Sequence, residues 1–347
     1  MDMLAAADAA VAPPPSPRVG TRLAALDLGT NNCRLLVAEV RGDGFEVIDS
    51  FSRIVRLGEG LARTERLSDP AMARTLTALK VCGRIIARHR VAGARCVATE
   101  ACRRAANGRE FLQRVQRVTG LELEVLRQED EARLAMLGCL PLLDPDARQL
   151  LVIDIGGGST EILWLDRSRP GEGGEPGTAL SLPLGVVTLS ETFGHEVGEE
   201  TFAAMVEHVH ERLMALHASR PLPRLADGAA LQMLGTSGTV TTLAAVHLGL
   251  RRYDRRKVDG LCLSFAAVKE TSDHLRMLDH ATRAANPCIG AGRADLVVAG
   301  CAILEAIHRQ WPVDQLCVAD RGVREGILAT LMGRNLHQLL DGAEDAA

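Results

Sequence analysis

The stretch LLVIDIGGGSTEILWL, residues 150–165, decides the fold. It is a continuous apolar run that ends at Asp154, a turn of glycine and small hydroxyl residues, and a second apolar run. Apolar runs of this length that are bounded by glycines are typical of buried β-strands. The stretch LAALDLGTNNCRLLVAEV, residues 23–40, has the same order of features around Asp27. Because a repeated strand–turn–strand unit indicates an internal duplication, the sequence predicts two related α/β lobes that face a cleft.

Further predicted elements complete both lobes. Short apolar runs at 45–51 and 54–61 extend the first unit into a β-meander, after which helices and strands alternate up to an acidic helix start at 128–137. Asp69 is the expected N-cap of the first long helix, because a proline follows it. A charged, glycine-rich stretch at 166–178 predicts an exposed hairpin loop. The second half should also contain a helix at 202–216, a strand that turns into a helix at 231–243, a helix at 294–309 and a strand at 315–320.

Composition limits the class of protein. The chain has 347 residues, 47% of them hydrophobic, and a formal net charge of −4, which argues against a protein dominated by nucleic-acid backbone contacts or by a basic membrane patch. The lysines are Lys80, Lys257 and Lys269, and none follows a glycine, so a GxxxxGK[ST] phosphate loop is excluded. The longest uncharged run, 228–250, is interrupted by glycines, threonines and a histidine, so no membrane span is expected. Any polyanion site must therefore be a local pocket.

Cysteines and histidines give no metal or disulfide signature. The nine cysteines form no CxxC pair and lie mostly in apolar or small-residue runs, so neither a disulfide framework nor a zinc ribbon is supported. The ten histidines contain no HExxH, and none is followed by aspartate. We therefore expect reduced core thiols and a cytoplasmic protein.

The glycine turns are the places where chemistry is expected. Successive backbone N–H groups in a tight turn form a concavity that suits phosphate, and an aspartate at the strand end can hold a divalent cation or its water. A third turn of this kind is GTSGT, residues 235–239. One glycine turn alone is more often a simple hairpin. The paired turns together with the third favour a site that grips a phosphate chain from two sides.

Several motifs resemble those of a known family. DLGTNNCRLL (27–36) and DIGGGSTE (154–161) resemble the phosphate-1 and phosphate-2 loops of the actin/Hsp70/sugar-kinase superfamily. The intervening and following motifs resemble, in order, those of the exopolyphosphatase/guanosine pentaphosphate phosphohydrolase (Ppx/GppA) family. They are RLGEGL (56–61), TEACRRAANGREF (99–111), EVLRQEDEARL (124–134), GTSGT (235–239), GRADLVVAG (292–300) and DRGVREGIL (320–328). The resemblance covers about Leu23 to Met332. No His-Asp dipeptide is present, so the chain resembles the short form of the family, which has no C-terminal His-Asp domain.

The resemblance implies the fold and the domain organisation. The expected architecture is α/β, with two lobes of ribonuclease-H-like architecture and an interdomain cleft. Lobe I should span 21–126 plus 321–347, and lobe II should span 127–320, after a disordered N-terminal arm over 1–20.

The resemblance also implies an activity and roles for acidic and basic residues. Family members release the terminal phosphate of inorganic polyphosphate or the 5′ γ-phosphate of guanosine pentaphosphate, with Mg²⁺ and an activated water. The match places the catalytic glutamate at Glu131 and a charge-neutralising arginine at Arg103. Asp154 and Glu161 match the metal-associated carboxylates, and Asp27 is expected to contact the metal through water. A stimulating monovalent cation is compatible with this site. Capping of the helix dipole is the alternative role of Glu131 and its acidic neighbours.

Phosphate contacts are expected from three loops. They should come from Thr30, Asn31 and Asn32 in the first loop, Gly157, Gly158, Ser159 and Thr160 in the second, and Gly235, Ser237 and Gly238 in the third. The run RRYDRRK (251–257) is most simply a solvated charged face. Its functional alternative is that Arg255, Arg256 and Lys257 guide the distal part of a long polyanion.

Two departures from the family pattern and the choice of substrate remain open. Arg127 and Gln128 stand where many relatives have Ser-Gly, which leaves the positioning of the base undecided. Cys33 replaces a bulkier apolar residue and is expected in the core. The chain has two tryptophans and one tyrosine, so no guanine-stacking pocket is evident and polyphosphate is modestly favoured. Neither the preferred chain length nor the oligomeric state is fixed by the sequence, and a homodimer is compatible with it.

Two other classes of function compete with hydrolysis. A phosphotransferase of the same superfamily would pass the phosphoryl group to ADP or a small acceptor, and the GTSGT turn is the only candidate for its nucleoside pocket. A non-catalytic alarmone or nucleotide sensor would use the same loops for binding and leave Glu131 idle. In each case we expect no nucleic-acid partner and no membrane association.

Overall fold

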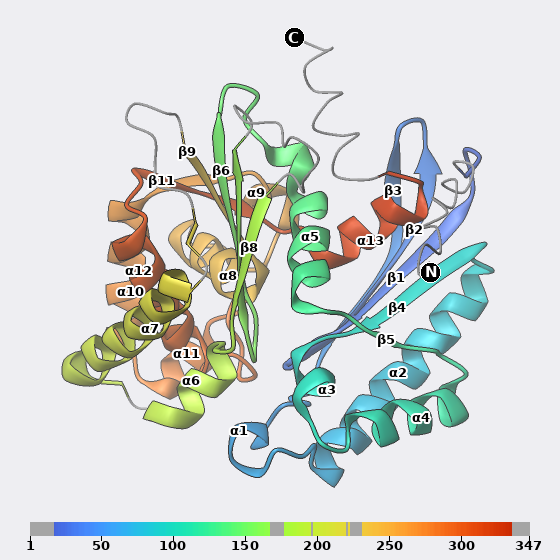
Figure 1. Cartoon of the computed structure of the whole chain (residues 1–347), viewed down its shortest axis with the longest axis horizontal. Coiled ribbons are helices and arrows are strands. Elements are labelled where there is room, and N and C mark those ends of the chain that lie inside the picture. The colour runs from blue at the N-terminus through green and yellow to red at the C-terminus, as the bar shows by residue number, and fades with distance from the viewer. Residues whose placement is uncertain (1–16, 167–176, 196, 220, 223–230, 335–347) are drawn as a thin grey trace, which may run out of the picture.

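The computed structural model describes residues 17–166, 177–195, 197–219, 221–222 and 231–334. The described chain forms two α/β lobes side by side, with α5 (Gln128–Cys139) and α13 (Val323–Leu331) between them (Figure 1). Most of the predicted N-terminal arm, most of the predicted hairpin loop and the chain beyond 334 lie outside the described residues.

Each lobe is built on a sheet with the same topology. The first sheet has the order β3-β2-β1-β4-β5, and the second has the order β10-β11-β9-β6-β7-β8. In both, an antiparallel meander of three strands is extended by two strands parallel to the first, and β10 adds an antiparallel edge in the second lobe. The predicted duplication is therefore confirmed. The strands are β1 (Arg22–Leu28), β2 (Asn32–Arg41), β3 (Gly44–Ile54), β4 (Gly93–Ala98), β5 (Glu124–Val125), β6 (Gln149–Ile155), β7 (Thr160–Asp166), β8 (Gly177–Leu182), β9 (Leu231–Thr236), β10 (Cys262–Ser264) and β11 (Gln315–Ala319).

Helices cover the faces of both sheets (Figure 1). In the first lobe they are α1 (Leu61–Thr64), α2 (Asp69–His89), α3 (Glu100–Arg104) and α4 (Gly108–Thr119). In the second lobe they are α6 (Val186–Phe193), α7 (Glu199–Ser219), α8 (Ser237–His247), α9 (Arg255–Val258), α10 (Phe265–Met277), α11 (His280–Ala285) and α12 (Val297–Gln310). None of the helices in the described part of the chain is both long and apolar enough to cross a membrane.

The predicted N-cap of the first long helix is wrong by one residue. Ser68, not Asp69, caps α2, because its hydroxyl accepts a hydrogen bond from the backbone N–H of Ala71. Asp69 becomes the first helical residue, where its negative charge favours the N-terminal end of the helix dipole.

Helix α5 packs into both lobes at once. Leu134 and Ala135 belong to the same apolar cluster as Val323 and Ile327 of α13 and the side chains of the first sheet. On its other side, α5 adds Met136 and Cys139 to the cluster beneath the second sheet. The two lobes are therefore joined through one shared helix.

Glycines bring α5 and α13 into backbone contact. A Cβ on Gly138 of α5 would lie 2.0 Å from the carbonyl oxygen of Gly322, just before α13. A Cβ on Gly326 of α13 would lie 2.0 Å from the carbonyl oxygen of Leu134 in α5. No side chain fits at either position, so the crossing of these helices is fixed by main-chain shape.

The expectation that all cysteines are reduced is wrong for one pair. Cys262 on β10 and Cys317 on β11 are direct cross-strand partners and form a disulfide. No CxxC motif marks this pair, because the two cysteines are 55 positions apart in the chain and meet only when β10 joins the sheet. The other seven cysteines are buried and free, and Cys33 is in the core as expected.

We predict that Gly138→Ala destabilises the protein by about 1–3 kcal/mol, because the added methyl group collides with backbone and not with a side chain that can rotate. The free energy of unfolding in urea measures this effect.

Gly83→Ala in α2 is the matched control. Its Cβ would meet its nearest atom at an ordinary 3.5 Å, and alanine is the better helix former, so we expect no loss and up to about 1 kcal/mol of stabilisation. Equal destabilisation by both changes would show that the close backbone contact between α5 and α13 does not make Gly138 more sensitive to substitution than an ordinary helical glycine.

Candidate active site

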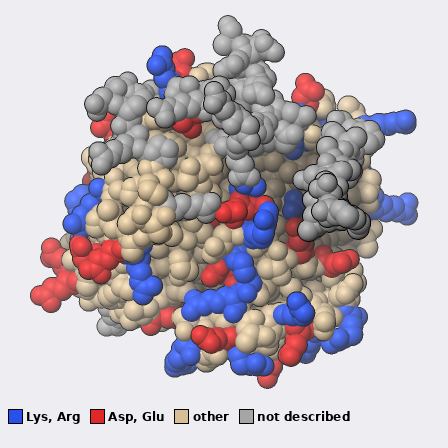
Figure 2. Space-filling view, in the orientation of Figure 1, with Lys and Arg blue, Asp and Glu red and all other residues tan. Residues whose placement is uncertain are grey.

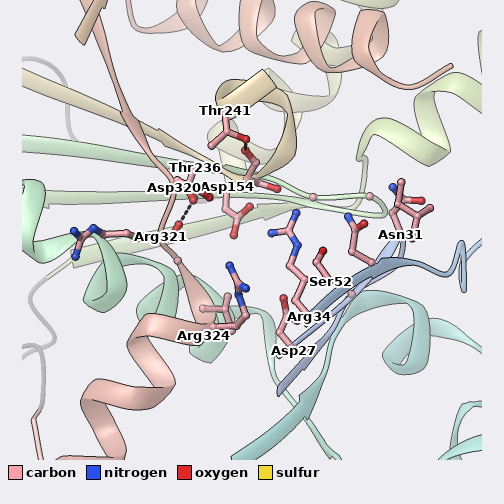
Figure 3. Close-up of a pocket in the computed structure, with 18 of the residues that line it drawn as sticks. Asp27, Asn31, Arg34, Ser52, Asp154, Thr236, Thr241, Asp320, Arg321 and Arg324 are labelled. Atoms are coloured by element: carbon pink, nitrogen blue, oxygen red, sulfur yellow. Dashed lines mark hydrogen bonds between the residues drawn. The ribbon is translucent and has the colours of Figure 1, made fainter. Parts of the chain in front are cut away.

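A cleft of about 1010 Å³ lies between the lobes and is lined by both of them. Its walls include the ends of β1, β6 and β9, the turns that follow these strands, and the start of α13 (Figure 3). The residues predicted for the site that line the cleft are Asp27, Thr30, Asn31, Asn32, Glu131, Asp154, Gly157, Gly158, Ser159, Glu161, Ser237 and Arg255. Basic side chains gather near the middle of the face in Figure 2, where the two lobes meet.

The first and second glycine turns touch each other across the cleft. A Cβ on Gly158 would lie 2.7 Å from Oγ1 of Thr30, and a Cβ on Gly157 would lie 3.2 Å from the backbone nitrogen of Asn31. The two turns also close alike: the N–H of Gly29 donates to the carbonyl of Asn32 at 2.9 Å, and the N–H of Gly156 donates to that of Ser159 at 3.0 Å. The duplicated loops therefore face one another at contact distance.

The third turn joins the site through Ser237. This residue has a backbone φ of 77°, a left-handed conformation that is strained for a residue with a side chain. Its side chain hydrogen-bonds to Asp154 and lowers the pKa of that carboxyl. Thr241 in the first turns of α8 donates its hydroxyl to the carbonyl of Ser237 at 2.8 Å. The strain is thus located at a residue that faces the cleft.

Six carboxyl groups line the cleft, and four of them, those of Asp27, Glu131, Asp154 and Glu161, interact with one another. Asp154 and Glu161 are direct cross-strand partners on β6 and β7, so their side chains project from the same face of the sheet. Burial raises the pKa of Asp154 to about 6, with Arg34 opposing it and Asp27 adding to it. Burial and the neighbouring Asp154 raise the pKa of Glu161 to about 8. Burial likewise raises the pKa of Asp27.

Glu131 owes its perturbed acidity to residues distant in sequence. Its pKa is raised well above the ordinary value by burial first and then by Glu161, while Arg103 acts in the opposite direction. The adjacent acidic residues Glu129 and Asp130 are not among the main causes. Asp130 instead pairs with Arg127 at 2.8 Å on the exposed side of α5. The first turn of the helix therefore sends only one of its carboxylates into the cleft.

Arg103 holds Glu131 from behind. Its Nη1 donates to Oε2 of Glu131 at 3.2 Å and to the carbonyl of Leu126 at 2.6 Å, and its Nη2 donates to Oε2 of Glu100 at 2.7 Å. Arg103 is not among the residues that line the cleft. Its guanidinium is shared between two carboxylates and a carbonyl, so the geometry favours orientation of Glu131 over direct contact with a phosphoryl group.

The donor set fits a hard divalent cation that keeps part of its water shell. Among the residues that the structure describes, no group of three or more His, Cys, Asp or Glu side chains is arranged to hold a metal by itself. The facing pair Asp154 and Glu161 supplies two carboxylates whose mutual repulsion a cation would relieve. Mg²⁺ usually takes one or two carboxylates and completes its octahedron with water and substrate phosphates. The residues present therefore fit Mg²⁺ with Asp27 nearby.

Arg34, Arg293 and Arg324 are three of the five cleft arginines that were missed as site residues in the sequence. Arg34 on β2 is the cross-strand partner of Asp27 and points toward Asp154, and Arg324 of α13 enters the same space from the other side (Figure 3). The Nη2 of Arg34 and the Cζ of Arg293 each lie 3.9 Å from the Cβ position of Gly238. Within the described residues none of the three forms an ion pair within 4 Å with an acidic side chain. Arg34 lies in the first loop motif, and the other two lie in GRADLVVAG and DRGVREGIL.

The predicted polyanion-guiding run is mostly committed to internal contacts or points into solvent. Arg255 donates to Oε1 of Glu325 at 2.9 Å and to the carbonyl of Asp320 at 2.6 Å. The side chain of Arg256 is 93% exposed and contacts Asp254. Neither Arg256 nor Lys257 lines the cleft. Of the three residues, only Arg255 reaches the cleft, and its charge is neutralised there by Glu325.

Three of the predicted phosphate-binding residues lie outside the main cleft. Thr160 is fully buried and donates its hydroxyl to the carbonyl of Leu184 at 2.8 Å. Gly235 is in β9, where a Cβ would lie 2.8 Å from the side chain of Val240. Gly238 lines a small adjoining cavity of about 40 Å³ that also contains Asn31 and Asn32. The Oδ1 atoms of both asparagines are buried with no hydrogen-bond partner in the described structure. Because an amide oxygen accepts and does not donate, these two atoms cannot themselves bind a phosphate oxygen.

Comparisons with known proteins agree with this geometry. A family model described as the Ppx/GppA phosphatase family matches residues 36–335. Exopolyphosphatase 2 of Mycobacterium tuberculosis is 33% identical over 331 residues, which cover 90% of this chain and 99% of that protein.

Solved structures give the same result for the fold. The crystal structure of an Aquifex aeolicus Ppx/GppA family member has a TM-score of 0.72 and 32% identity, and covers 89% of this chain and 97% of its own. An exopolyphosphatase from Cytophaga hutchinsonii has a TM-score of 0.79 over 93% of this chain and 98% of its own, at 24% identity, which supports the fold alone. The predicted two-lobed fold of the actin/Hsp70/sugar-kinase type is confirmed.

We predict that Glu161→Gln stabilises the metal-free protein at high pH. The pKa of Glu161 in the folded state, about 8, lies above its ordinary 4.5, so the fold favours the protonated form. The resulting loss of stability is absent below about pH 4.5, grows as the pH rises and is complete above about pH 8. Thermal unfolding in EDTA should therefore show the variant about 1–3 kcal/mol more stable than the parent at pH 8.5, and nearly equal to it at pH 4.5.

Asp49→Asn provides a comparison of opposite sign. His89 and then Arg88 hold the pKa of Asp49 below its ordinary value, so its carboxylate stabilises the fold above about pH 4 and that stability is lost as the pH falls further. This variant should be less stable than the parent at pH 8.5. A Glu161→Gln variant that also loses stability there would contradict the electrostatic strain that we assign to the cleft.

Proposed function

Since this chain belongs to the Ppx/GppA phosphatase family, we propose that it hydrolyses the terminal phosphate of inorganic polyphosphate by attack of a water molecule that Glu131 activates. One observation carries the proposal. Arginines that form no ion pair within 4 Å among the described residues line the cleft from both lobes, together with a buried carboxylate at the start of α5. Such a site attracts a multiply charged anion and places a base beside it.

Glu131 is suited to take a proton from water. A general base works best when its pKa lies near the operating pH, and burial raises the pKa of this carboxyl in that direction. Arg103 and the helix backbone hold the side chain in one place, since Oε2 accepts from Nη1 of Arg103 at 3.2 Å. In this proposal the free oxygen of Glu131 accepts the proton as the water attacks phosphorus, and Arg103 acts as a positioning residue.

The glycine turns supply the grip on the transferred phosphoryl group. Backbone N–H groups and the hydroxyls of Thr30 and Ser159 line the cleft at the point where the two loops touch. Hydrogen bonds from fixed donors in a closed site stabilise charge that develops on the phosphoryl oxygens without reorganisation. The opposing loops would thereby hold the phosphorus in line with the attacking water.

Arg34 and Arg324 would neutralise the charge of the phosphate chain. Both are half-buried, and neither forms an ion pair within 4 Å with an acidic side chain among the described residues. Their guanidinium forks match phosphate oxygens. Mg²⁺, when held by Asp154 and Glu161 with Asp27 reached through water, would withdraw charge from the phosphate oxygens as a Lewis acid.

The cleft also contains an apolar section that favours guanosine pentaphosphate as a second candidate substrate. Leu36, Val47 and Ile54 line it from the first lobe, and Cys288 and Ile289 line it from the second. Polyphosphate has no apolar part to bury there, whereas a nucleoside does. Polyphosphate stays our first choice because none of these residues is aromatic and Tyr253, the tyrosine of the cleft, donates its hydroxyl to Asp320.

The direct test is release of inorganic phosphate by the purified chain with Mg²⁺, from polyphosphates of several lengths and from guanosine pentaphosphate in parallel. We predict that Glu131→Gln lowers kcat by at least about 100-fold while thermal unfolding shows that the fold is intact. Glutamine keeps the size of the side chain and loses the ability to accept the proton.

Glu129→Gln is the matched control, since Glu129 lies in the same helical turn and does not line the cleft. Its kcat should stay within about twofold of the parent. Absence of phosphate release from every substrate by the parent would refute hydrolysis, and formation of ATP when ADP is added would favour the phosphotransferase alternative.

The arginines give a separate prediction. Arg324→Gln should reduce kcat/KM for tripolyphosphate by about 100-fold, because it removes a cleft cation that forms no ion pair within 4 Å among the described residues. Arg256→Gln should change kcat/KM by less than about twofold on short and long chains alike, because this side chain is in solvent. A selective loss on long chains in Arg256→Gln would restore the guiding role that the sequence suggested for the run at 255–257.

A further inference from the structure

Two sequence motifs meet each other across the cleft through residues that have no role in the proposed chemistry. RLGEGL follows β3 in the first lobe, and GRADLVVAG leads into α12 in the second. Nη2 of Arg56 in the first motif contacts both carboxylate oxygens of Asp295 in the second, at 3.1 and 2.9 Å, and the carbonyl oxygen of Gly292 at 3.4 Å. We propose that Arg56 and Asp295 form a latch that holds the lobes closed and thereby positions the first phosphate loop; the catalytic part of this inference rests on the proposed function.

The ion pair between Arg56 and Asp295 is largely buried and well packed. The side chain of Asp295 is 10% exposed and that of Arg56 is 34% exposed, so the pair is shielded from the screening that makes most surface ion pairs weak. The residues around the ion pair are closely packed, since a Cβ on Gly292 would lie 2.4 Å from Cδ1 of Ile54. The backbone carbonyl of Asp295 is fixed in turn by the hydroxyl of Ser190 at 2.8 Å.

A second contact between the lobes supports the same edge. The backbone N–H of Gly60, in the RLGEGL motif, donates to Oε1 of Glu191 in α6 at 2.7 Å. Helices α1 and α6 accordingly lie near each other at the lower edge of Figure 1, away from the crossing of α5 and α13. The cleft is thus bounded by the helix crossing on one side and, on the other, by polar contacts and the contact between Ile54 and Gly292. This second edge can open without disrupting a packed core.

Arg56 connects this edge directly to the first phosphate loop. Its backbone N–H donates to the carbonyl of Asn31 at 3.0 Å, and the N–H groups of Val55 and Gly58 donate to the carbonyls of Asn31 and Thr30 at 2.8 and 2.9 Å. Arg56 has a left-handed φ of 47°, a strained conformation for arginine that the surrounding hydrogen bonds enforce. A movement of the latch is therefore transmitted to the loop that meets Gly157 and Gly158.

The latch matters for substrate binding because it determines whether the lobes are closed. The phosphate-binding groups are divided between the lobes, so the complete set exists only when the lobes are closed. A latch of polar contacts can break for exchange of substrate and product and can form again for the chemical step. Its partners lie outside the carboxylate cluster, so Arg56 acts through loop position and not through contact with the reacting atoms.

A double-mutant cycle with Arg56→Gln and Asp295→Asn tests the latch. We expect each single change to lower kcat/KM for tripolyphosphate about tenfold and the double variant to be no worse than either single, because each change already breaks the same contact. Amide hydrogen exchange should speed up in residues 29–32 and 156–160 of all three variants and stay unchanged in α2 and α7.

Glu59→Gln is the matched control. Glu59 lies in the same motif as Arg56 and pairs with Arg74 of α2 at 2.7 Å. This pair lies within the first lobe, and both side chains are about half exposed. It should leave kcat/KM within about twofold and leave loop exchange unchanged. Multiplying effects of Arg56→Gln and Asp295→Asn, unchanged exchange in the loops, or an equal effect of Glu59→Gln would each overturn the latch. If the parent releases no phosphate at all, the proposed function fails, and the exchange data alone decide whether the latch exists.

Discussion

The contact on which the rest of the molecule depends is the crossing of α5 and α13, where glycines replace side chains. Gly138 and Gly326 each place a helix against a backbone carbonyl of its neighbour, so the two helices meet at a distance that no other residue permits. The N-terminal end of α5 carries Glu131, and that of α13 carries Arg324 and Glu325. Since both ends open into the cleft, the crossing sets the distance between the proposed base and the cation opposite it.

The chemistry of the cleft works against the stability that this crossing provides. Burying several carboxyl groups together raises the pKa of each of them, which means that their ionised forms destabilise the fold. Arg103 and Arg34 relieve part of this repulsion without removing it. A site that binds a cation and phosphate groups, as we propose for this cleft, has to tolerate such a balance, because side chains that fully satisfied one another would leave nothing for a ligand.

The sequence predicted the architecture more accurately than it predicted which side chains contact each residue. The strand–turn–strand units, the helix start before Glu131 and the cross-cleft grouping of Asp27, Asp154 and the glycine turns follow from local patterns and motif order, and the structure has them. The Cys262–Cys317 pair could not be found, because it depends on β10 joining a sheet edge. The sequence alone could not decide between the two interpretations of the run at 255–257 for a similar reason: whether an arginine is available to a ligand depends on partners such as Glu325, which are distant in sequence.

The duplication contains one signal that would have located Arg34. It follows Asp27 by seven positions, as Glu161 follows Asp154 by seven, and in both lobes the strand register places these residues opposite each other. The same geometric position therefore holds a cation in the first lobe and an anion in the second. Two like loops would bind a phosphate chain from both sides in the same way. In the function that we propose, the unlike partners beside the two aspartates let Arg34 meet phosphate oxygens in one lobe, while Glu161 offers a carboxylate to a metal in the other. The divergence at this single position explains why two similar halves make one asymmetric site.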